Sequence, residues 1–346
     1  MKNKKVINNY KNNFYKDIQK ANLAPLWEVL SDLVTPTPRT RAVPYLWSWK
    51  EVQEHVFNSG DIITAEEAIR RVLILENPGM KGESKITDTL YAGLQLILPK
   101  EIAPCHRHTQ SALRFVVYGD GAYTSVDGEK VTMHPGDFII TPSWKWHDHG
   151  NESCEPMVWL DGLDIPIVNQ FTSSFAQKLE QKRQILSKPK GDSIARYGSG
   201  LLPVNSNSLN NKVSPVFSYP YAKTREALEK MKIKNEWDQS HGLKLKYTNP
   251  INGGHAISTM ATFMQLLPKT FDGRLTRSTD GTVYCVVEGD GNTIIDKKNY
   301  SWGKGDIFVI PGWTPFKHSV KNESVLFSFS DRPVQEFLGL YKEEII

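Results

Sequence analysis

The chain has 346 residues, of which 39% are apolar and 23% charged, and its formal net charge is +4. This length suits about two domains, and the apolar content is enough for sizeable cores. The charge is spread along the chain without a basic stripe, which argues against nucleic acid as a partner. No apolar run approaches the ~20 residues of a membrane span, so we expect no membrane association. The absence of an apolar signal-peptide core, and three cysteines without a CxxC pair, favour a cytoplasmic location.

The first 60 residues are predicted to form a helical arm. Residues 11–33 carry apolar side chains at helical spacing, namely Leu23, Leu26, Trp27, Leu30 and Leu33. The Pro- and Thr-rich residues 35–41 indicate a loop. Beyond the arm, Thr64 and Glu67 have the spacing of a capping box, which predicts the start of a helix.

Residues 61–175 are predicted to form a barrel of short strands. Asp127-Gly128 is a strong hairpin signal between two of these strands. The strands are expected at residues 115–118, 122–126, 130–133 and 138–142. Short strands at even spacing, separated by Gly and Pro, are typical of a jelly roll, so the predicted fold class is all-β.

Four of the nine histidines stand in two short clusters of this barrel. His106 and His108 alternate along a predicted strand and therefore share one face. A third imidazole, from His147 or His149, would complete a set of three nitrogen ligands. Such a set leaves positions open on the metal, as catalytic metals require. Imidazole ligands suit iron, zinc, copper or nickel, and spacing does not choose among these metals.

The two clusters resemble the two motifs of the cupin superfamily. The first carries His-x-His, and the second reads Gly136, five residues, Pro142, then His147 and Asn151. The position of Asn151 favours His147 as the third ligand. The chain departs from the second motif at one position, where Trp144 replaces a Gly.

The first motif also lacks its usual Glu after His-x-His, and Arg114 lies close to where that Glu would stand. The predicted metal site is therefore His106, His108 and His147 without a carboxylate. Three neutral imidazoles leave a divalent metal with its full charge, so we expect an anionic, chelating substrate.

Internal repetition predicts a second cupin barrel at residues 251–346, so the whole chain is expected to be a bicupin. Residues 116–121 recur at 286–291, and residues 136–144 recur at 305–313. Counting from the Pro-Lys pair of each copy, His106 and His108 fall opposite Leu275 and Arg277. Only His318 remains near the second motif, and the placement of a two-residue gap decides whether it matches His147 or His149. We expect this barrel to be metal-free and to serve packing.

Residues 176–250 are predicted to connect the barrels. We expect a polar helix at 176–187, a mobile Gly-, Ser- and Asn-rich segment at 191–211, and a second helix at 222–234.

The longer motifs resemble those of gentisate 1,2-dioxygenases, a family similar to salicylate and 1-hydroxy-2-naphthoate dioxygenases. The resemblance is densest from residue 70 to residue 162. It is carried by residues 70–79, 91–99, 106–115 and 144–151, and by the shorter segments 25–27 and 44–47.

This resemblance implies an Fe(II) enzyme that uses O2 to cleave the ring of a small aromatic hydroxy acid. The bond cleaved lies between the carboxyl-bearing carbon and the adjacent hydroxyl-bearing carbon, and gentisate would give maleylpyruvate. The resemblance also implies a homotetramer, in which the long N-terminal arm could serve assembly.

The substrate carboxylate needs cationic partners, and an Arg side chain can bind it with two parallel hydrogen bonds. Arg114 is the first candidate, because it lies an even six residues beyond His108 and shares its face if the strand is regular. Arg70 or Arg71 is the second. The residues alone do not separate these two, and the family resemblance favours Arg70.

Four further residues are expected in the site. His149 could move a proton from the substrate hydroxyl, because imidazole titrates near neutral pH. It could instead be the third ligand. The family resemblance suggests that Gln95 and Asp161 orient the substrate or the histidines. Tyr91 stands on a strand near the pocket, where we expect some relatives to carry Trp.

Two other classes of function stay open at this point. One is a cupin enzyme with different chemistry, which the missing Glu disfavours because such sites usually retain a carboxylate. The other is a non-catalytic bicupin that binds a small ligand, which the open three-histidine site disfavours. Metal content and oxygen consumption would separate these classes.

Overall fold

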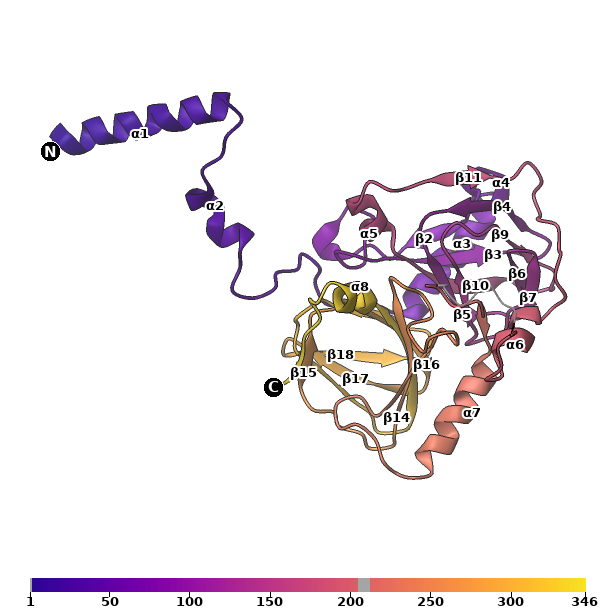
Figure 1. The fold of residues 1–346 in the computed structure, drawn as a ribbon. Coiled ribbons are helices and arrows are strands. Elements are labelled where there is room, and N and C mark those ends of the chain that lie inside the picture. Colours follow the sequence, from indigo (N-terminus) through magenta and orange to yellow (C-terminus); the bar gives the residue numbers. More distant parts are fainter. Residues whose placement is uncertain (1, 205–211) are drawn as a thin grey trace. The chain divides into compact units, whose positions relative to one another are not determined.

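The computed structural model describes residues 2–204 and 212–346, with side chains described from residue 8 onwards. Contacts divide the chain into two units, residues 1–39 and residues 40–346 (Figure 1). We expected the arm to extend to residue 60, whereas the contact boundary falls at residue 39. The reason is that residues 45–47 pair with a strand of the second barrel.

The first unit contains the helices α1 (Lys2–Lys20) and α2 (Leu26–Leu33). The sequence predicted one helix over residues 11–33, but a turn separates the two. Asn22 has a φ of 56° there, and Pro25 precedes the first residue of α2. Tyr15 of α1 donates a hydrogen bond to Glu28 of α2 (2.5 Å) and accepts one from Trp27 (3.1 Å). The apolar stripe of α2 is exposed in this chain.

The first barrel consists of two antiparallel sheets. One has the strand order β12-β8-β5-β10-β3-β2, and the other has the order β11-β4-β9-β6-β7. The six strands of the first sheet are β2 (Val72–Ile74), β3 (Tyr91–Ile97), β5 (Ala112–Tyr118), β8 (Phe138–Thr141), β10 (Met157–Leu163) and β12 (Ser218–Tyr219). The five strands of the second are β4 (Ile102–His108), β6 (Ala122–Val126), β7 (Glu129–Thr132), β9 (His147–Asn151) and β11 (Ala176–Lys178).

The second barrel repeats this plan. Its sheets have the orders β1-β19-β16-β21-β14-β13 and β18-β17-β20-β15-β22. The first sheet consists of β1 (Tyr45–Trp47), β13 (Leu243–Lys246), β14 (Ala261–Leu267), β16 (Thr282–Glu288), β19 (Ile307–Ile310) and β21 (Ser324–Ser330). The second consists of β15 (Thr276–Ser278), β17 (Asp290–Ile295), β18 (Lys298–Gly303), β20 (Phe316–Ser319) and β22 (Glu343–Ile345). The predicted all-β bicupin fold is therefore confirmed.

Local sequence accounts for the strand boundaries. The four strands expected between residues 115 and 142 are present as β5 to β8. Asp127 and Gly128 both have positive φ, 48° and 84°, as the two-residue turn between β6 and β7 requires. The expected capping box is present at the start of α4 (Ala65–Ala68), where Thr64 accepts a hydrogen bond from the backbone of Glu67.

The connection between the barrels differs in part from its prediction. The helix expected at 222–234 is present as α7 (Tyr221–Lys232). The polar helix expected at 176–187 is wrong, because residues 176–178 form β11 and pair with β4. Part of the segment expected to be mobile forms α6 (Asp192–Tyr197), and residues 205–211 lie outside the described residues. The remaining helices are α3 (Trp49–Ile62), the 3-10 helix η1 (Pro78–Met80), α5 (Ile165–Gln170) and α8 (Arg332–Phe337).

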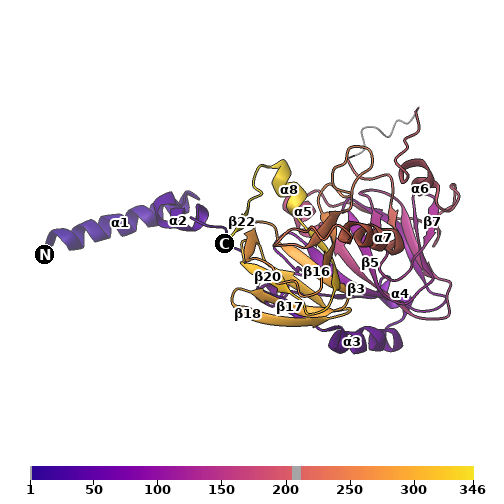
Figure 2. The same ribbon diagram turned by 90° about the horizontal axis from the view of Figure 1, so that it is seen from below.

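The two halves of the chain exchange one strand each. The strand that precedes each barrel in the sequence pairs with a strand of the other barrel. The strand β1 precedes the first barrel in sequence but pairs with β19 of the second. Conversely, β12 lies between the two barrels in the sequence and pairs with β8 of the first barrel. It is followed by α7, which leads towards the second barrel. Figure 2 labels α7 and also α3, the helix that follows β1. Each exchanged strand leads into a helix whose first turn is anchored by an Asp. The backbone N–H of Trp49 donates to Asp306 (2.7 Å), and that of Tyr221 donates to Asp137 (2.9 Å).

An apolar core joins the two barrels. Phe115 of β5 stacks on Phe327 of β21, with ring centroids 4.1 Å apart and an interplanar angle of 5°. Both rings are buried, and one continuous cluster of buried residues extends from them into both barrels. Burial of so much apolar surface favours a fixed arrangement of the barrels. The barrel that carries the two histidine clusters therefore shares an apolar core with the second barrel.

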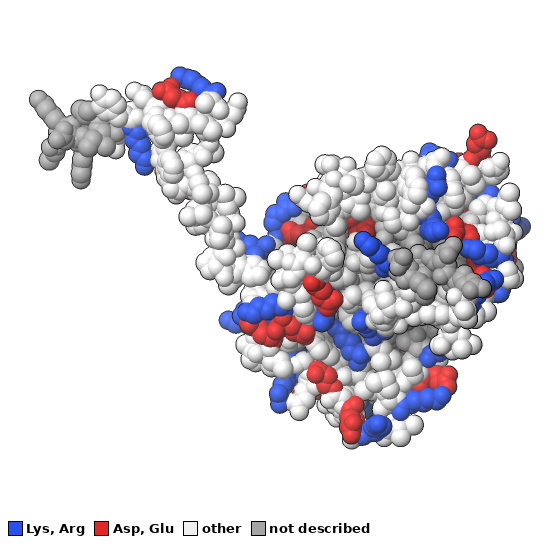
Figure 3. Space-filling model, viewed as in Figure 1, with Lys and Arg blue, Asp and Glu red and all other residues white. Residues whose placement is uncertain are grey.

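Charged side chains of both signs are interspersed on the face of the molecule shown in Figure 3, in keeping with the absence of a basic stripe in the sequence. No helix within residues 2–204 and 212–346 is both long enough and apolar enough to cross a bilayer.

Replacement of Phe327 by Ala is expected to destabilise the 40–346 unit by about 3–5 kcal/mol, because it leaves a cavity at the stacked pair. Urea unfolding followed by tryptophan fluorescence would measure this. Phe337→Ala is the matched control, because the Phe337 side chain is 87% exposed and its loss should cost less than about 0.5 kcal/mol. Equal stabilities for the two variants would contradict the proposed role of the interface.

Asp331 makes a second contact between the barrels and should give stability a pH dependence. Its carboxylate accepts hydrogen bonds from Thr89 (2.9 Å) and from the backbone of Gly281 (3.0 Å). Burial raises its pKa from 3.8 to about 6. The folded protein therefore binds this proton more tightly than the unfolded chain does. The resulting stabilisation is fully present below pH 3.8 and is lost as the pH rises through about 6.

Asp331→Asn cannot ionise, so the stability advantage of the wild type over this variant should shrink by up to roughly 3 kcal/mol from pH 3.5 to pH 7. Unfolding free energies of both proteins, measured over this pH range, would test it. An advantage that stays constant or grows with pH would contradict the raised pKa.

Candidate metal centre

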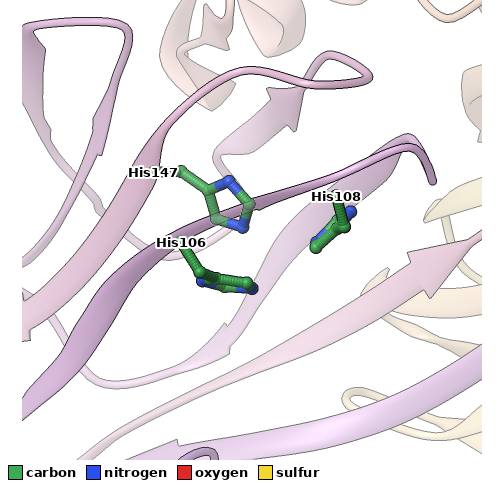
Figure 4. Close-up of side chains that lie close together, drawn as sticks. All are labelled: His106, His108 and His147. Atoms are coloured by element: carbon green, nitrogen blue, oxygen red, sulfur yellow. The ribbon is translucent and has the colours of Figure 1, made fainter. Parts of the chain in front are cut away.

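Three histidines of the first barrel converge, as the sequence predicted. His106 and His108 lie on β4, and His147 is the first residue of the neighbouring strand β9 (Figure 4). Antiparallel pairing places His106 directly opposite His147. One nitrogen from each of the three rings can be chosen so that these atoms all lie within 4.8 Å of one another. This separation suits a single ion bound between them.

The backbone orients two of these rings. The Nδ1 atom of His108 lies 2.8 Å from the carbonyl of Gln110, and that of His147 lies 2.9 Å from the carbonyl of Lys145. A carbonyl only accepts, so both Nδ1 atoms carry a proton and both Nε2 atoms present a lone pair. The Nε2 atom of His147 is buried and has no hydrogen-bond partner among the described residues. An ion would satisfy this atom, so these residues fit a metal.

Burial also keeps the three rings neutral. It lowers the pKa of His106 to about 2 and that of His108 to about 4, and it holds the pKa of His147 well below its usual value. Neighbouring cations act in the same direction, among them Arg70 and Arg114. A metal ligand must be deprotonated, so at neutral pH these rings are ready to bind.

Arg70, and not Arg71, lies at the site. The guanidinium of Arg70 contacts the ring of His106 and donates to the carbonyl of Pro104 (2.9 Å). Arg71 turns away and makes a bidentate ion pair with Glu101, both distances being 2.8 Å. The residues alone did not show whether Arg70 or Arg71 faces the histidines, and the structure places Arg70 there. The two side chains differ because adjacent residues around the start of β2 point to opposite sides.

Arg114 reaches the site from the opposite sheet. The sequence argument placed it on the same strand as His108, but β4 ends at His108 and β5 begins at Ala112, so that argument was wrong. Arg114 lies opposite Asp161 in the pairing of β5 with β10, and its Nε atom is 3.6 Å from Asp161 Oδ1. It also donates to the hydroxyl of Thr141 (2.6 Å).

The two arginines retain unused hydrogen-bonding capacity. Arg70 Nη1 and Arg114 Nε are buried and have no hydrogen-bond partner among the described residues. Burial lowers the pKa of Arg70 to about 9, and the positive charge of Arg114 adds to this effect. Both guanidiniums still carry their charge at neutral pH. Buried N–H groups of this kind favour an anionic ligand, because leaving them unpaired is costly.

Asp161 and Gln95 lie on one face of neighbouring strands. Gln95 of β3 stands opposite Trp159 of β10, and Asp161 follows Trp159 by two residues. The Trp159 indole donates to Asp161 (3.0 Å). Burial raises the pKa of Asp161 to about 6, although the charges of Arg114 and Arg70 oppose this. Tyr91 is at the start of β3, four residues before Gln95 and therefore on the same face. Burial raises its pKa above the usual range.

His149 lies beside the triad but outside it. Its side chain is fully buried, its ring centroid is 5.8 Å from that of His147, and it does not join the three-histidine group. Its Nδ1 atom lies 2.9 Å from the hydroxyl of Thr124. Its Nε2 atom has no hydrogen-bond partner among the described residues.

The sequence argument missed Trp159, Thr124 and Thr141, which hold Asp161, His149 and Arg114 respectively. Trp159 could have been found from its strand, because it alternates with Asp161 and must share its face. Thr124 and Thr141 carry no such signal, since their partners lie on other strands.

The second barrel shows what replaces the ligands. His318 is hydrogen-bonded to Thr293 (2.8 Å), just as His149 is to Thr124, and both pairs stand directly opposite each other in their sheets. His318 therefore matches His149, and Phe316 takes the place of His147.

The counterparts of the other two ligands differ from the prediction by one residue. Thr276 pairs with Phe316 as His106 pairs with His147. The backbone N–H of Trp313 donates to the carbonyl of Ser278, as the backbone N–H of Trp144 donates to that of His108. The expected counterparts Leu275 and Arg277 were wrong, because Thr276 lies seven residues after Lys269, whereas His106 lies six residues after Lys100. A metal-free second barrel remains a prediction.

Comparisons with known proteins agree with this geometry. A family model described as a cupin domain matches residues 93–163. The chain is 52% identical to gentisate 1,2 dioxygenase 1 of Aquipseudomonas alcaligenes over 98% of both chains. It is 35% identical to the 5-aminosalicylate 1,2-dioxygenase of a Comamonas species, over 95% of this chain and 89% of the relative.

Solved structures give the same result. The salicylate 1,2-dioxygenase of Pseudaminobacter salicylatoxidans superposes with a TM-score of 0.91 at 32% identity and covers 97% of both chains. The same enzyme has been solved as an adduct with gentisate, again with a TM-score of 0.91, covering 97% of this chain and 94% of that chain. The extent and level of these similarities show that the chain belongs to the gentisate 1,2-dioxygenase family of bicupin ring-cleaving dioxygenases.

Proposed function

We propose that this protein is an Fe(II)-dependent dioxygenase that inserts O2 into gentisate and produces maleylpyruvate. The bond cleaved would lie between the carboxyl-bearing carbon and the adjacent hydroxyl-bearing carbon. Besides family membership, one observation in the structure supports this proposal. Three neutral imidazoles stand beside two buried guanidiniums that retain unpaired N–H groups. Such a site can hold a divalent metal and an organic anion together.

His106, His108 and His147 would hold the iron. Imidazole suits iron, and three neutral ligands leave the ion its full charge for an anionic substrate. Fe(II) held there would supply a Lewis-acidic centre that binds the carboxylate and ortho hydroxyl of the substrate and keeps both reactants together.

Arg70 would bind the substrate carboxylate through its unpaired Nη1 atom, and Arg114 would bind it through a guanidinium N–H group other than Nε, which faces Asp161. Asp161 would keep Arg114 in place, since their side chains are 3.6 Å apart and both are buried. Gln95 and Tyr91, on the same face of β3, would orient the ring. Water is kept from the polar groups here, so each hydrogen bond to the substrate is stronger than it would be in solvent.

His149 would accept the proton of the substrate hydroxyl. Burial keeps its ring neutral, and its Nε2 atom is not engaged by another described residue. With Nδ1 protonated and donating to Thr124, Nε2 would present a lone pair and could take a proton.

Salicylate or 1-hydroxy-2-naphthoate is the second candidate substrate. A salicylate 1,2-dioxygenase shares the fold at a TM-score of 0.91, and a relative 33% identical over 89% of this chain is a 1-hydroxy-2-naphthoate dioxygenase from a Nocardioides species. These acids have the same carboxylate and ortho hydroxyl as gentisate, so the same chelation would operate.

The proposal includes a homotetramer in the cytoplasm. The apolar side chains of α2 are exposed, so they could pack on another subunit. The three cysteines are unpaired, as in a reducing compartment. Analytical ultracentrifugation and cell fractionation would test these two statements.

Oxygen uptake by anaerobically Fe(II)-loaded protein should match gentisate consumption one to one, with a near-ultraviolet band from the conjugated enol of the product. His108→Ala should abolish uptake, because removal of one ligand leaves the ion weakly held. The control is His134→Ala, at an exposed histidine outside the site, which should keep full activity.

Other outcomes would have definite meanings. Turnover of salicylate or 1-hydroxy-2-naphthoate, without turnover of gentisate, would support the ring-cleaving reaction and contradict gentisate as the substrate. Bound iron without oxygen uptake on any of the three acids would overturn the dioxygenase proposal and favour a non-catalytic, ligand-binding bicupin.

Replacement of Arg114 by Gln should lower kcat/KM for gentisate by about 10–100-fold, because a hydrogen bond to a charged group is worth roughly 1.5–3 kcal/mol. Steady-state oxygen consumption would measure this. The iron content of the variant should stay at the wild-type level, because Arg114 is not a ligand. Unchanged kcat/KM in an iron-replete variant would rule out a role in carboxylate binding.

A further inference from the structure

The residue between the two ligands of β4 is itself held in an unusual way. Arg107 alternates with His106 and His108, so its side chain points to the outer face of the sheet. Its guanidinium carbon lies 4.6 Å from the ring centroid of Trp144 and 4.5 Å from that of Trp146. Both distances are within the range of cation–π contacts.

A glutamine fixes the orientation of this guanidinium. Arg107 Nε and Nη2 both donate to the side-chain carbonyl of Gln177, at 2.9 and 2.6 Å. Gln177 lies on β11, directly opposite Arg107 in the pairing of β11 with β4. The side chain of Arg107 therefore connects three segments: β4, β11 and the loop that leads into β9.

His108 pairs with Ala176 of β11 on one side, but on the side of β9 it lies outside the strand ladder. The ladder between β4 and β9 shifts register between Ala103 and His106, and its last pair is His106 with His147. His108 lies beyond that pair. Its backbone connection on this side is the hydrogen bond from Trp144 N to His108 O (2.7 Å), and Trp144 has a φ of 62°. The separation of His108 from His147 thus depends on the loop containing Trp144 and Trp146.

The second barrel offers an internal comparison. Arg277 occupies the place of Arg107 and lies 4.4 Å from the ring of Trp313, which has the same φ as Trp144. Two features differ. Pro315 stands where Trp146 would be, and the residue opposite Arg277 is Glu344 instead of a glutamine. Both barrels therefore have one Arg–Trp contact at this position. The second Arg–Trp contact occurs in the barrel that has the three histidines, and Pro315 replaces its tryptophan in the other barrel.

We propose that Arg107 is a positioning residue of the metal centre, and this inference rests on the proposed metal site. In cation–π contact with Trp144 and Trp146 and hydrogen-bonded to Gln177, it connects the loop before His147 to the strand that carries His106 and His108. It thereby holds His108 and His147 at a separation at which one ion can contact both. Arg107 touches neither metal nor substrate, so its effect is on ligand geometry.

Arg107→Met tests this directly, because Met keeps much of the side-chain length but lacks the cation and the N–H donors. Titration of the metal-free full-length protein with Co(II), followed by its visible absorption, would give the dissociation constant and the coordination spectrum. We expect the dissociation constant to rise about 10–100-fold, as for other residues that support metal ligands, and the absorption band to change in position or intensity. Arg107→Lys keeps the charge but loses the planar stack and one of the two bonds to Gln177, so its loss should be intermediate.

Arg277→Met is the matched control, because it removes the corresponding stack from the barrel without the three histidines. It should leave Co(II) affinity within twofold of wild type, while thermal unfolding of the two metal-free variants should show similar shifts. Wild-type affinity in Arg107→Met would overturn the inference, and so would an equal loss in Arg277→Met. Failure of the wild-type protein to bind Co(II) would instead overturn the proposed metal site.

Discussion

The pairing of β4 with β9 is the contact on which the rest of the site depends. It places His106 directly opposite His147, although 40 residues separate them in the chain. The two-residue period of a strand then puts His108 on the same face. A shift of either strand by one residue would turn its histidines to the outer face and end the convergence. The convergence of the three histidines is thus a consequence of strand register.

Burial determines the charge of the groups that this register brings together. It keeps the histidines neutral, which suits them to bind a metal. The same environment leaves N–H groups of Arg70 and Arg114 without partners among the described residues. A metal and an organic anion would satisfy both sets of groups at once. The chemistry proposed here therefore follows from desolvation as much as from residue identity.

Duplication of the barrel explains why one copy can specialise. The second barrel has Thr276, Ser278 and Phe316 at the ligand positions, and aromatic and aliphatic side chains such as Tyr284 and Phe308 fill its interior. The exchanged strands and the Phe115–Phe327 stack fix this well-packed copy against the other. The second barrel therefore keeps the fold without the three histidines, and buried polar atoms without hydrogen-bond partners occur in both barrels, among them His318 Nε2 and Ser328 Oγ.

The sequence by itself determined the all-β bicupin fold, the strands between residues 115 and 142, and the three histidines that converge in the first barrel. Each of these depends on short-range signals, namely alternation, turn residues and motif spacing. The sequence did not reveal the strand β11 at residues 176–178, because its three residues pair with β4 from far along the chain. Tertiary structure alone decided that Arg70 faces the site while Arg71 pairs with Glu101, and that His318 matches His149. It also decided that Arg114 reaches the site from the other sheet. These outcomes depend on contacts between distant strands. One additional residue between Lys269 and Thr276 was enough to displace the predicted counterparts of His106 and His108 by one position.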